Sequence, residues 1–216
     1  DQTGQSVSVG DADGDGLDDL LIGAFQDEYP AGVNNTGQAW LLTGAKLRTL
    51  SPGTTTLQAV GATAIERHEG GYGEGVLVSI VGDTDGDGDS ELLVHALRGP
   101  SNAFAGYPEV LSLDGEDAWP LDLPHGWDDT GVGRSLAFGD ATGDGRPDLL
   151  VGAYGAAHAI YGVDAGSVWS FARAGDGFSR WPVEQSAAFY ARNSSDRVGY
   201  GLTADTDLDG DGYDDL

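Results

Sequence analysis

Cysteine and methionine are both absent from this chain of 216 residues, and lysine occurs only once, at Lys46. The lack of cysteine excludes disulfides and thiol chemistry, although it does not fix the compartment in which the protein works. No apolar run approaches the roughly 20 residues that a membrane-spanning helix requires, and no leader peptide is visible at the N-terminus. We therefore expect no insertion into a membrane.

Positive charge is also scarce, because 36 acidic residues face only 10 basic ones and the net charge is −26. Such a chain repels nucleic acid and anionic membrane surfaces, so neither is an expected partner. The acidic residues are not evenly spread. Half of them, 18 of 36, lie in four short segments.

These segments are four copies of one nine-residue acidic loop. Loop 1 is DADGDGLDD from Asp11, loop 2 is DTDGDGDSE from Asp83, loop 3 is DATGDGRPD from Asp140, and loop 4 is DLDGDGYDD from Asp207. Each has oxygen-bearing side chains at positions one, three, five and nine, and glycine at positions four and six. Loops 1 to 3 each run into a short apolar stretch. Recurrence in the same local setting indicates an internal repeat.

So many carboxylates in nine residues repel one another unless a cation lies between them. The donors are all oxygens, which favours Ca²⁺ over zinc or copper and, in a flexible protein cage, over Mg²⁺. We predict up to four Ca²⁺ ions, held by the side chains at positions one, three, five and nine and the backbone carbonyl at position seven. The predicted ligands are Asp11, Asp13, Asp15, Leu17 and Asp19; Asp83, Asp85, Asp87, Asp89 and Glu91; Asp140, Thr142, Asp144, Arg146 and Asp148; and Asp207, Asp209, Asp211, Tyr213 and Asp215.

The alternatives to such a site are an EF-hand and a metal-free turn. An EF-hand needs a bidentate Glu at position twelve and flanking helices, but Ile22, Val94 and Val151 stand there in β-prone runs. Metal-free Asp-Gly turns are the plainer alternative, which four copies in register disfavour. Thr142 lowers the negative charge of loop 3, which predicts a weaker cation site. In loop 2 the side chain at position nine, Glu91, is one methylene longer than the Asp of the other loops.

The spacing of the loops predicts units of about 65 residues, each with room for about four short strands. The residue pattern of the units contains no convincing amphipathic helix. The expected strands lie at 5–9, 20–24, 38–43 and 55–60; at 76–81, 91–96, 109–113 and 119–123; at 134–138, 149–153, 167–171 and 181–185; and at 200–204.

Four features follow one another in the chain: a glycine before the first strand, the DxDGDGxxD loop, LLIGA and then GQAWLLTG. Together they resemble the FG-GAP repeat of integrin α-subunit β-propellers and their bacterial relatives. The matching segments are 4–24 with 37–44, 76–96, 133–153 with 166–172, and 199–216. The resemblance implies an all-β fold of four-stranded antiparallel blades, with each Ca²⁺ loop joining the first two strands. The repeat units would be 1–71, 72–130, 131–196 and 197–216, about three and a half blades of one propeller segment, residues 1–216.

Three and a half blades do not close a ring, because propellers have at least four. Either the chain is part of a longer, seven-bladed propeller or further copies complete the ring. His95 departs from the pattern, since Gly23 and Gly152 stand at its place in the other repeats. We expect a packed, hydrogen-bonded histidine there and some distortion of the second blade.

The resemblance implies an extracellular or cell-surface adhesion or protein-interaction module, in which Ca²⁺ is structural and a protein or glycan ligand binds the face opposite the calcium loops. Millimolar extracellular Ca²⁺ also suits sites of this kind. The candidate binding loops are 25–36, 98–107, 154–164, 62–72, 125–130 and 190–196; their aromatic residues are Phe25, Tyr29, Tyr72, Tyr107, Trp127, Tyr154 and Tyr190. Each ring could instead pack between blades.

A carbohydrate-binding propeller is the alternative, and a polysaccharide-active enzyme is a weaker one. His68, His95, His125 and His158 stand in unrelated settings, and no GxSxG stands at a strand-to-helix turn. We therefore predict no catalytic residue and no organic cofactor, while a pair of catalytic carboxylates remains open.

Overall fold

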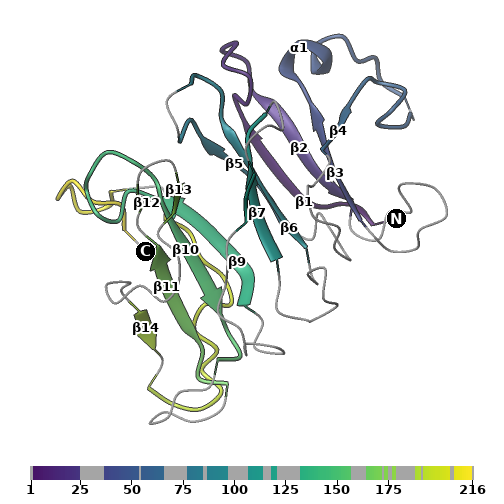
Figure 1. Cartoon of the computed structure of the whole chain (residues 1–216). Helices are drawn as coiled ribbons and strands as arrows, with labels where there is room; N and C mark the ends of the chain where they lie inside the picture. The colour runs from purple at the N-terminus through teal and green to yellow at the C-terminus, as the bar shows by residue number, and fades with distance from the viewer. Residues whose placement is uncertain are drawn as a thin grey trace. The chain divides into compact units, whose positions relative to one another are not determined.

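The computed structural model describes residues 2–24, 37–53, 55–65, 77–84, 87–96, 107–113, 118–120, 132–156, 164–171, 173–174, 177–178, 188–190, 192–204 and 207–215. Within these residues the regular structure is antiparallel β-sheet apart from one four-residue helix (Figure 1). The all-β prediction is confirmed. No helix among the described residues is long and apolar enough to cross a membrane.

The strands form three four-stranded sheets in which neighbours in the chain are neighbours in the sheet. Blade 1 contains β1 (Thr3–Gly10), β2 (Asp19–Ala24), β3 (Gln38–Leu42) and β4 (Thr63–Ile65), with helix α1 (Gly44–Leu47) after β3. Blade 2 contains β5 (Leu77–Gly82), β6 (Glu91–Ala96), β7 (Tyr107–Leu111) and β8 (Ala118–Pro120). Blade 3 contains β9 (Val132–Gly139), β10 (Asp148–Ala153), β11 (Ser167–Phe171) and β14 (Ala188–Tyr190); β12 (Arg173–Ala174) and β13 (Gly177–Phe178) pair separately. These are the blades that the repeat predicts.

The predicted strands that flank loops 1 to 3 are confirmed, but the predicted strands at 55–60 and 200–204 are wrong. Residues 57–61 form a turn instead of a strand, because Ala62 N donates to Leu57 O at 2.9 Å and Lys46 Nζ reaches the carbonyl of Gly61. The fourth strand of blade 1 begins afterwards, at Thr63. Residues 200–204 are irregular, since no strand among the described residues of the fourth repeat pairs with them. The expected strand at 181–185 lies outside the described residues.

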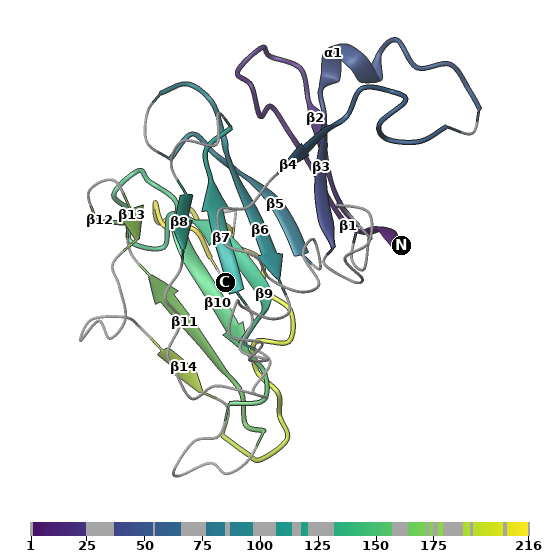
Figure 2. The same cartoon turned by 45° about the vertical axis from the view of Figure 1, so that its right-hand side comes forward.

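The chain comprises two compact units. Unit 1 comprises Asp1–Asn102 and Tyr107–Pro120, and unit 2 comprises Ala103–Gly106 and Leu121–Leu216. Figure 2 shows the same sheets from a second side. Whether residues 1–216 form a single domain stays a prediction.

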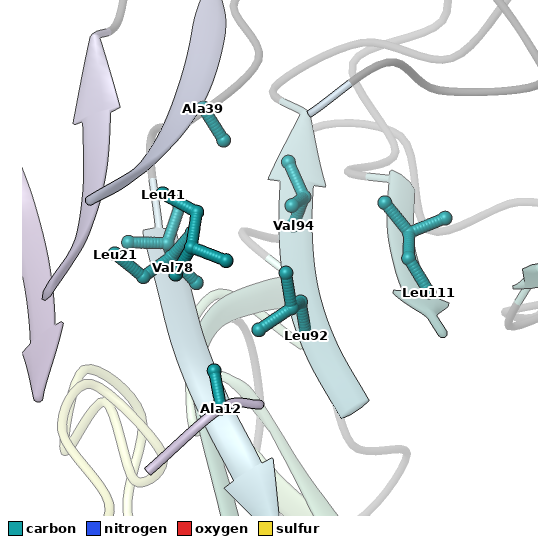
Figure 3. Packing of buried hydrophobic residues seen from close by; sticks show 8 residues of the cluster. All are labelled: Ala12, Leu21, Ala39, Leu41, Val78, Leu92, Val94 and Leu111. Atoms are coloured by element: carbon teal, nitrogen blue, oxygen red, sulfur yellow. The ribbon is translucent and has the colours of Figure 1, made fainter. Parts of the chain in front are cut away.

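The core of unit 1 lies between blades 1 and 2 (Figure 3). Leu21 and Leu41 of blade 1 pack against Val78, Leu92 and Val94 of blade 2. These side chains are at most 4% exposed, and each contributes about 1.5–3 kcal/mol through burial.

The edges of the two blades are also joined through serine hydroxyls. Val78 N donates to Ser6 Oγ, and Ile80 N donates to Ser8 Oγ, both at 3.0 Å. The hydroxyls thereby satisfy amides of β5 on the side that faces blade 1.

Unit 2 has its own core, in which blade 3 packs against the beginning of the fourth repeat. Ala137, Leu150 and Val168 surround Ala204, and Ser135 Oγ donates to Gly199 O at 2.8 Å. Glycine is required at position 152 because a Cβ there would lie 2.2 Å from Gly199 O.

His95 occupies the corresponding position in β6 and is 2% exposed. Its predicted burial is therefore confirmed. The expected distortion does not occur at this residue, because His95 pairs regularly with Leu77 and Pro108. The register shift of blade 2 lies instead between Ile80 and Gly82.

Candidate metal centres

Each acidic loop connects the first and second described strands of its repeat in blades 1 to 3, and its ninth residue begins the second strand. Asp19, Glu91 and Asp148 are the first residues of β2, β6 and β10, and they pair with Gly10, Gly82 and Gly139. The loops are thus held at both ends by a sheet. Loop 4 is described at residues 207–215 without flanking strands.

A hydrogen bond from position six to position one recurs in all four loops. The glycine amide donates to Oδ2 of the first aspartate at 2.9 Å in loop 1, 3.1 Å in loop 2, 2.7 Å in loop 3 and 2.9 Å in loop 4. The donating glycines, Gly16, Gly88, Gly145 and Gly212, have φ values of +80° to +104°. Only a residue without Cβ adopts this conformation at little cost, so the glycine is what folds the loop back on its first carboxylate.

A second recurring hydrogen bond orients the carboxylate at position five. The amide at position seven donates to Oδ1 of that aspartate at 2.8 to 3.0 Å in all four loops. The side chain is thereby fixed within the loop.

In loops 1 and 4 the carboxylates at positions one, three and five converge. One oxygen from each of Asp11, Asp13 and Asp15 lies within 4.8 Å of the others, and Asp207, Asp209 and Asp211 form the same cluster in loop 4. Asp85, at position three of loop 2, lies outside the described residues. In loop 3, Thr142 stands at position three in place of a carboxylate.

The electrostatics of loop 1 fit a cation. Asp11 Oδ1 is buried and has no hydrogen-bond partner among the described residues, which is costly for a carboxylate oxygen that does not hold an ion. Burial raises the pKa of Asp13, and the neighbouring charges of Asp19 and Asp15 raise it further. A bound divalent ion would neutralise this repulsion. In loop 4 the amide of Gly212 lowers the pKa of Asp207, which favours the charged form.

The ninth residue has a structural role that the sequence analysis missed. Asp19 is fully buried, and its two oxygens accept hydrogen bonds from Ala12 N at 2.8 Å and Gly44 N at 2.6 Å. Asp148 is also fully buried and accepts from Thr142 N at 2.9 Å. Asp215 accepts from Leu208 N at 2.8 Å.

In loop 2, Glu91 is 1% exposed and accepts from Thr84 N at 2.6 Å and from the Thr84 hydroxyl. In every loop, therefore, the ninth carboxylate ties the end of the loop to its beginning, and in loop 1 also to the start of α1. Its part in binding a cation stays a prediction, as do the carbonyl ligands at position seven.

Most of the predicted ligand-binding loops, residues 25–36, 66–72, 98–106, 125–130 and 157–163, lie outside the described residues, as do His68, His125 and His158. One candidate ring is well placed: Tyr154 packs edge to face against Tyr200 of the fourth repeat, with ring centroids 5.4 Å apart. For Tyr154, this contact favours packing between repeats.

Two comparisons with known proteins, one with a family model and one with individual protein sequences, indicate the same family. The model of the FG-GAP repeat matches residues 3–42 and 132–171, which span the first three strands of blades 1 and 3 together with loops 1 and 3. Integrin alpha-IIb of Mus musculus is 34% identical over 170 residues, 73% of this chain and 15% of that protein. Integrin alpha-5 of Xenopus laevis is 32% identical over 167 residues, 70% of this chain and 15% of that protein. The chain therefore spans about 15% of the length of these relatives.

Proposed function

The chain is built of FG-GAP repeats and is related to the integrin α-subunits, and we propose that it is a calcium-stabilised propeller segment of an extracellular adhesion or protein-interaction module. The calcium part of the proposal is carried by the convergence of Asp11, Asp13 and Asp15, and by the buried Oδ1 of Asp11, which has no hydrogen-bond partner in the described part of the chain. An all-oxygen donor set of this kind suits a hard cation of the size of Ca²⁺.

The proposed ions stabilise the fold and do not take part in chemistry. Ions that bind only the folded chain stabilise it by mass action. At about 1 mM Ca²⁺ and a dissociation constant of about 10⁻⁴ M, each site contributes about 1.4 kcal/mol. Four sites would supply a large share of the 5–15 kcal/mol by which a typical domain is stable. Such concentrations of Ca²⁺ occur outside the cell, which supports the proposed location.

Blade 1 also has a sheet face suited to a further blade. Val7 and Val9 are 57% and 63% exposed, and they pair with Ile22 and Leu20. In blade 2 the residue that corresponds to Val7 is Val78, which is 3% exposed because it packs against blade 1. We therefore propose that another blade, from a longer polypeptide or a second chain, covers Val7 and Val9.

A protein or glycan ligand would bind on the face opposite the acidic loops.

Thermal unfolding of the purified chain in excess chelator, in millimolar Ca²⁺ and in millimolar Mg²⁺ tests the calcium proposal. We expect Ca²⁺ to raise Tm by many degrees and Mg²⁺ to raise it much less, because Mg²⁺ dehydrates reluctantly and demands a stricter octahedral geometry. Asp11→Ala combined with Asp207→Ala should reduce the Ca²⁺-dependent shift. An unchanged Tm in Ca²⁺ would mean that the loops are metal-free turns.

A further inference from the structure

Loops 1 and 2, which belong to neighbouring blades of unit 1, are hydrogen-bonded directly to each other. Ser90, the eighth residue of loop 2, donates its hydroxyl to Asp11 O at 2.7 Å and its amide to Ala12 O at 2.9 Å. Ser90 is 9% exposed, so water competes little for these bonds. The eighth residue of one loop therefore holds the backbone of the loop before it.

The same relationship recurs independently in unit 2. Asp214, the eighth residue of loop 4, accepts a hydrogen bond on Oδ2 from Asp140 N at 2.7 Å, and its own amide donates to Asp140 O at 3.0 Å. The side chain differs from that of Ser90, but both eighth residues bond to the first residue of the preceding loop. The contact is thus a property of the repeat.

The glycine at position four makes room for this approach. A Cβ on Gly14 would lie 2.7 Å from Gly88 O, and a Cβ on Gly143 would lie 2.5 Å from Cε1 of Tyr213. Both distances are shorter than a Cβ tolerates. In each pair, a glycine of the first loop contacts position six or seven of the second.

The residues joined in this way carry the proposed ligands. Asp11 supplies the carboxylate whose Oδ1 has no hydrogen-bond partner among the residues that the structure describes, and Ser90 stands between Asp89 and Glu91, two predicted ligands of loop 2. A cation that fixes loop 2 fixes Ser90, and Ser90 fixes the backbone from which Asp11 projects. If an ion bound at one site raises the affinity of the other site, an ion bound at the other site raises the affinity of the first by the same factor.

We propose that the loops take up their cations as two cooperative pairs, loops 1 with 2 and loops 3 with 4, with Ser90 and Asp214 as the coupling residues. The inference rests on the proposed calcium binding. Repulsion between neighbouring ions opposes the coupling, but loops 1 and 2 each contain five acidic residues, which outweigh the two charges of one ion. In the second pair, Asp214 also brings a carboxylate to loop 3, which has only three of its own.

Calorimetric titration with Ca²⁺ tests the first pair in a chain carrying Asp140→Ala and Asp207→Ala, which leaves loops 1 and 2. We expect a Hill coefficient above 1 for this protein. Adding Asp83→Ala, which disables loop 2, should weaken binding at loop 1 by about fivefold or more. Ser90→Ala should retain two binding events but lower the Hill coefficient towards 1, because it removes the hydroxyl bond to Asp11 O and keeps the amide bond to Ala12 O.

Ser8→Ala is the matched control, because it removes another hydroxyl that bridges blades 1 and 2 but does so at the strands, away from the loops. It should leave the Hill coefficient unchanged. For the second pair, studied with Asp11→Ala and Asp83→Ala, Asp214→Ala should lower the Hill coefficient, because it removes the acceptor of the Asp140 amide. Asp18→Ala, which removes the same charge at position eight of loop 1, should not. Unfolding in chelator shows whether each variant is folded.

The outcomes separate this inference from the calcium proposal. Absence of any Ca²⁺ binding in the unmodified chain would refute both. Binding with a Hill coefficient of 1 in the two-loop protein, or a Hill coefficient that Ser90→Ala does not lower, would overturn the coupling and leave the calcium proposal standing.

Discussion

Gly44, the first residue of helix α1, donates its amide to Oδ1 of Asp19 at 2.6 Å. The two residues are 25 positions apart, and the bond joins the end of loop 1 to the start of the helix that follows the third strand of the same blade. Ala12 N occupies the other carboxylate oxygen. Asp19 therefore supports the fold directly, independently of any cation.

Asp19→Ala should destabilise the chain even in excess chelator. Both amides would lose a buried, charged acceptor, and each such bond contributes about 1.5–3 kcal/mol. We expect the free energy of unfolding in urea to fall by about 3 kcal/mol. Asp15→Ala, at an exposed position of the same loop, should cost less than about 1 kcal/mol in chelator but reduce the stabilisation by Ca²⁺. Equal effects of the two substitutions in chelator would contradict this division of roles.

The role of Asp19 also shows where sequence reasoning ended. The repeated loops located the first two strands of each blade, because the apolar runs after Asp19, Glu91 and Asp148 have to enter a sheet. Spacing alone predicts the same ligand role for position nine as for positions one, three and five, because it does not reveal which carboxylate is buried. Only the register of the sheet shows that this residue begins a strand and meets two amides.

Strands far from a loop were harder to place. The segment 55–60 contains Thr and Leu residues suited to a strand, but tertiary contacts decide its structure: Lys46 reaches the carbonyl of Gly61, and the chain turns there before β4. In the same way, the coupling of loops through Ser90 depends on a contact between residues 79 positions apart. No local pattern contains that information.

Gly16→Ala should be costly although space for the methyl group exists. Apart from its chain neighbours, no described residue has an atom within 4 Å of the position of a Cβ, but φ is +80°, a conformation that costs a residue with Cβ about 1–2 kcal/mol. Gly53→Ala is the matched control, because its Cβ also meets open space while its φ lies outside this range. Urea unfolding should show a loss for Gly16→Ala alone, together with weaker Ca²⁺ binding. A neutral Gly16→Ala would mean that loop 1 folds differently.

Valines at corresponding positions of blades 1 and 2 should differ in their contribution to stability. Val78→Ala removes methyl groups from the core between the blades and should cost about 2 kcal/mol. Val7→Ala, at a residue 57% exposed, should change the free energy of unfolding by less than about 0.5 kcal/mol.

If a second copy of the chain covers this face, Val7→Asp should lower the apparent mass measured by light scattering at micromolar concentration. A monomeric unmodified chain would instead exclude a second copy at this concentration. It would leave a further blade of a longer polypeptide as the proposed occupant.

Thr142→Asp should strengthen loop 3 as a calcium site. Thr142 is exposed, and its amide is already held by Asp148 at 2.9 Å, so the backbone at position three does not have to move. The new carboxylate would join Asp140 and Asp144, as Asp13 joins Asp11 and Asp15 in loop 1. In a chain whose other loops are disabled by Asp11→Ala, Asp83→Ala and Asp207→Ala, calorimetry should show tighter Ca²⁺ binding. Thr142→Asn, which adds an oxygen donor without charge, should have a smaller effect. Equal gains from Asp and Asn would show that donor number limits this loop, whereas no gain from either would mean that loop 3 does not hold a cation.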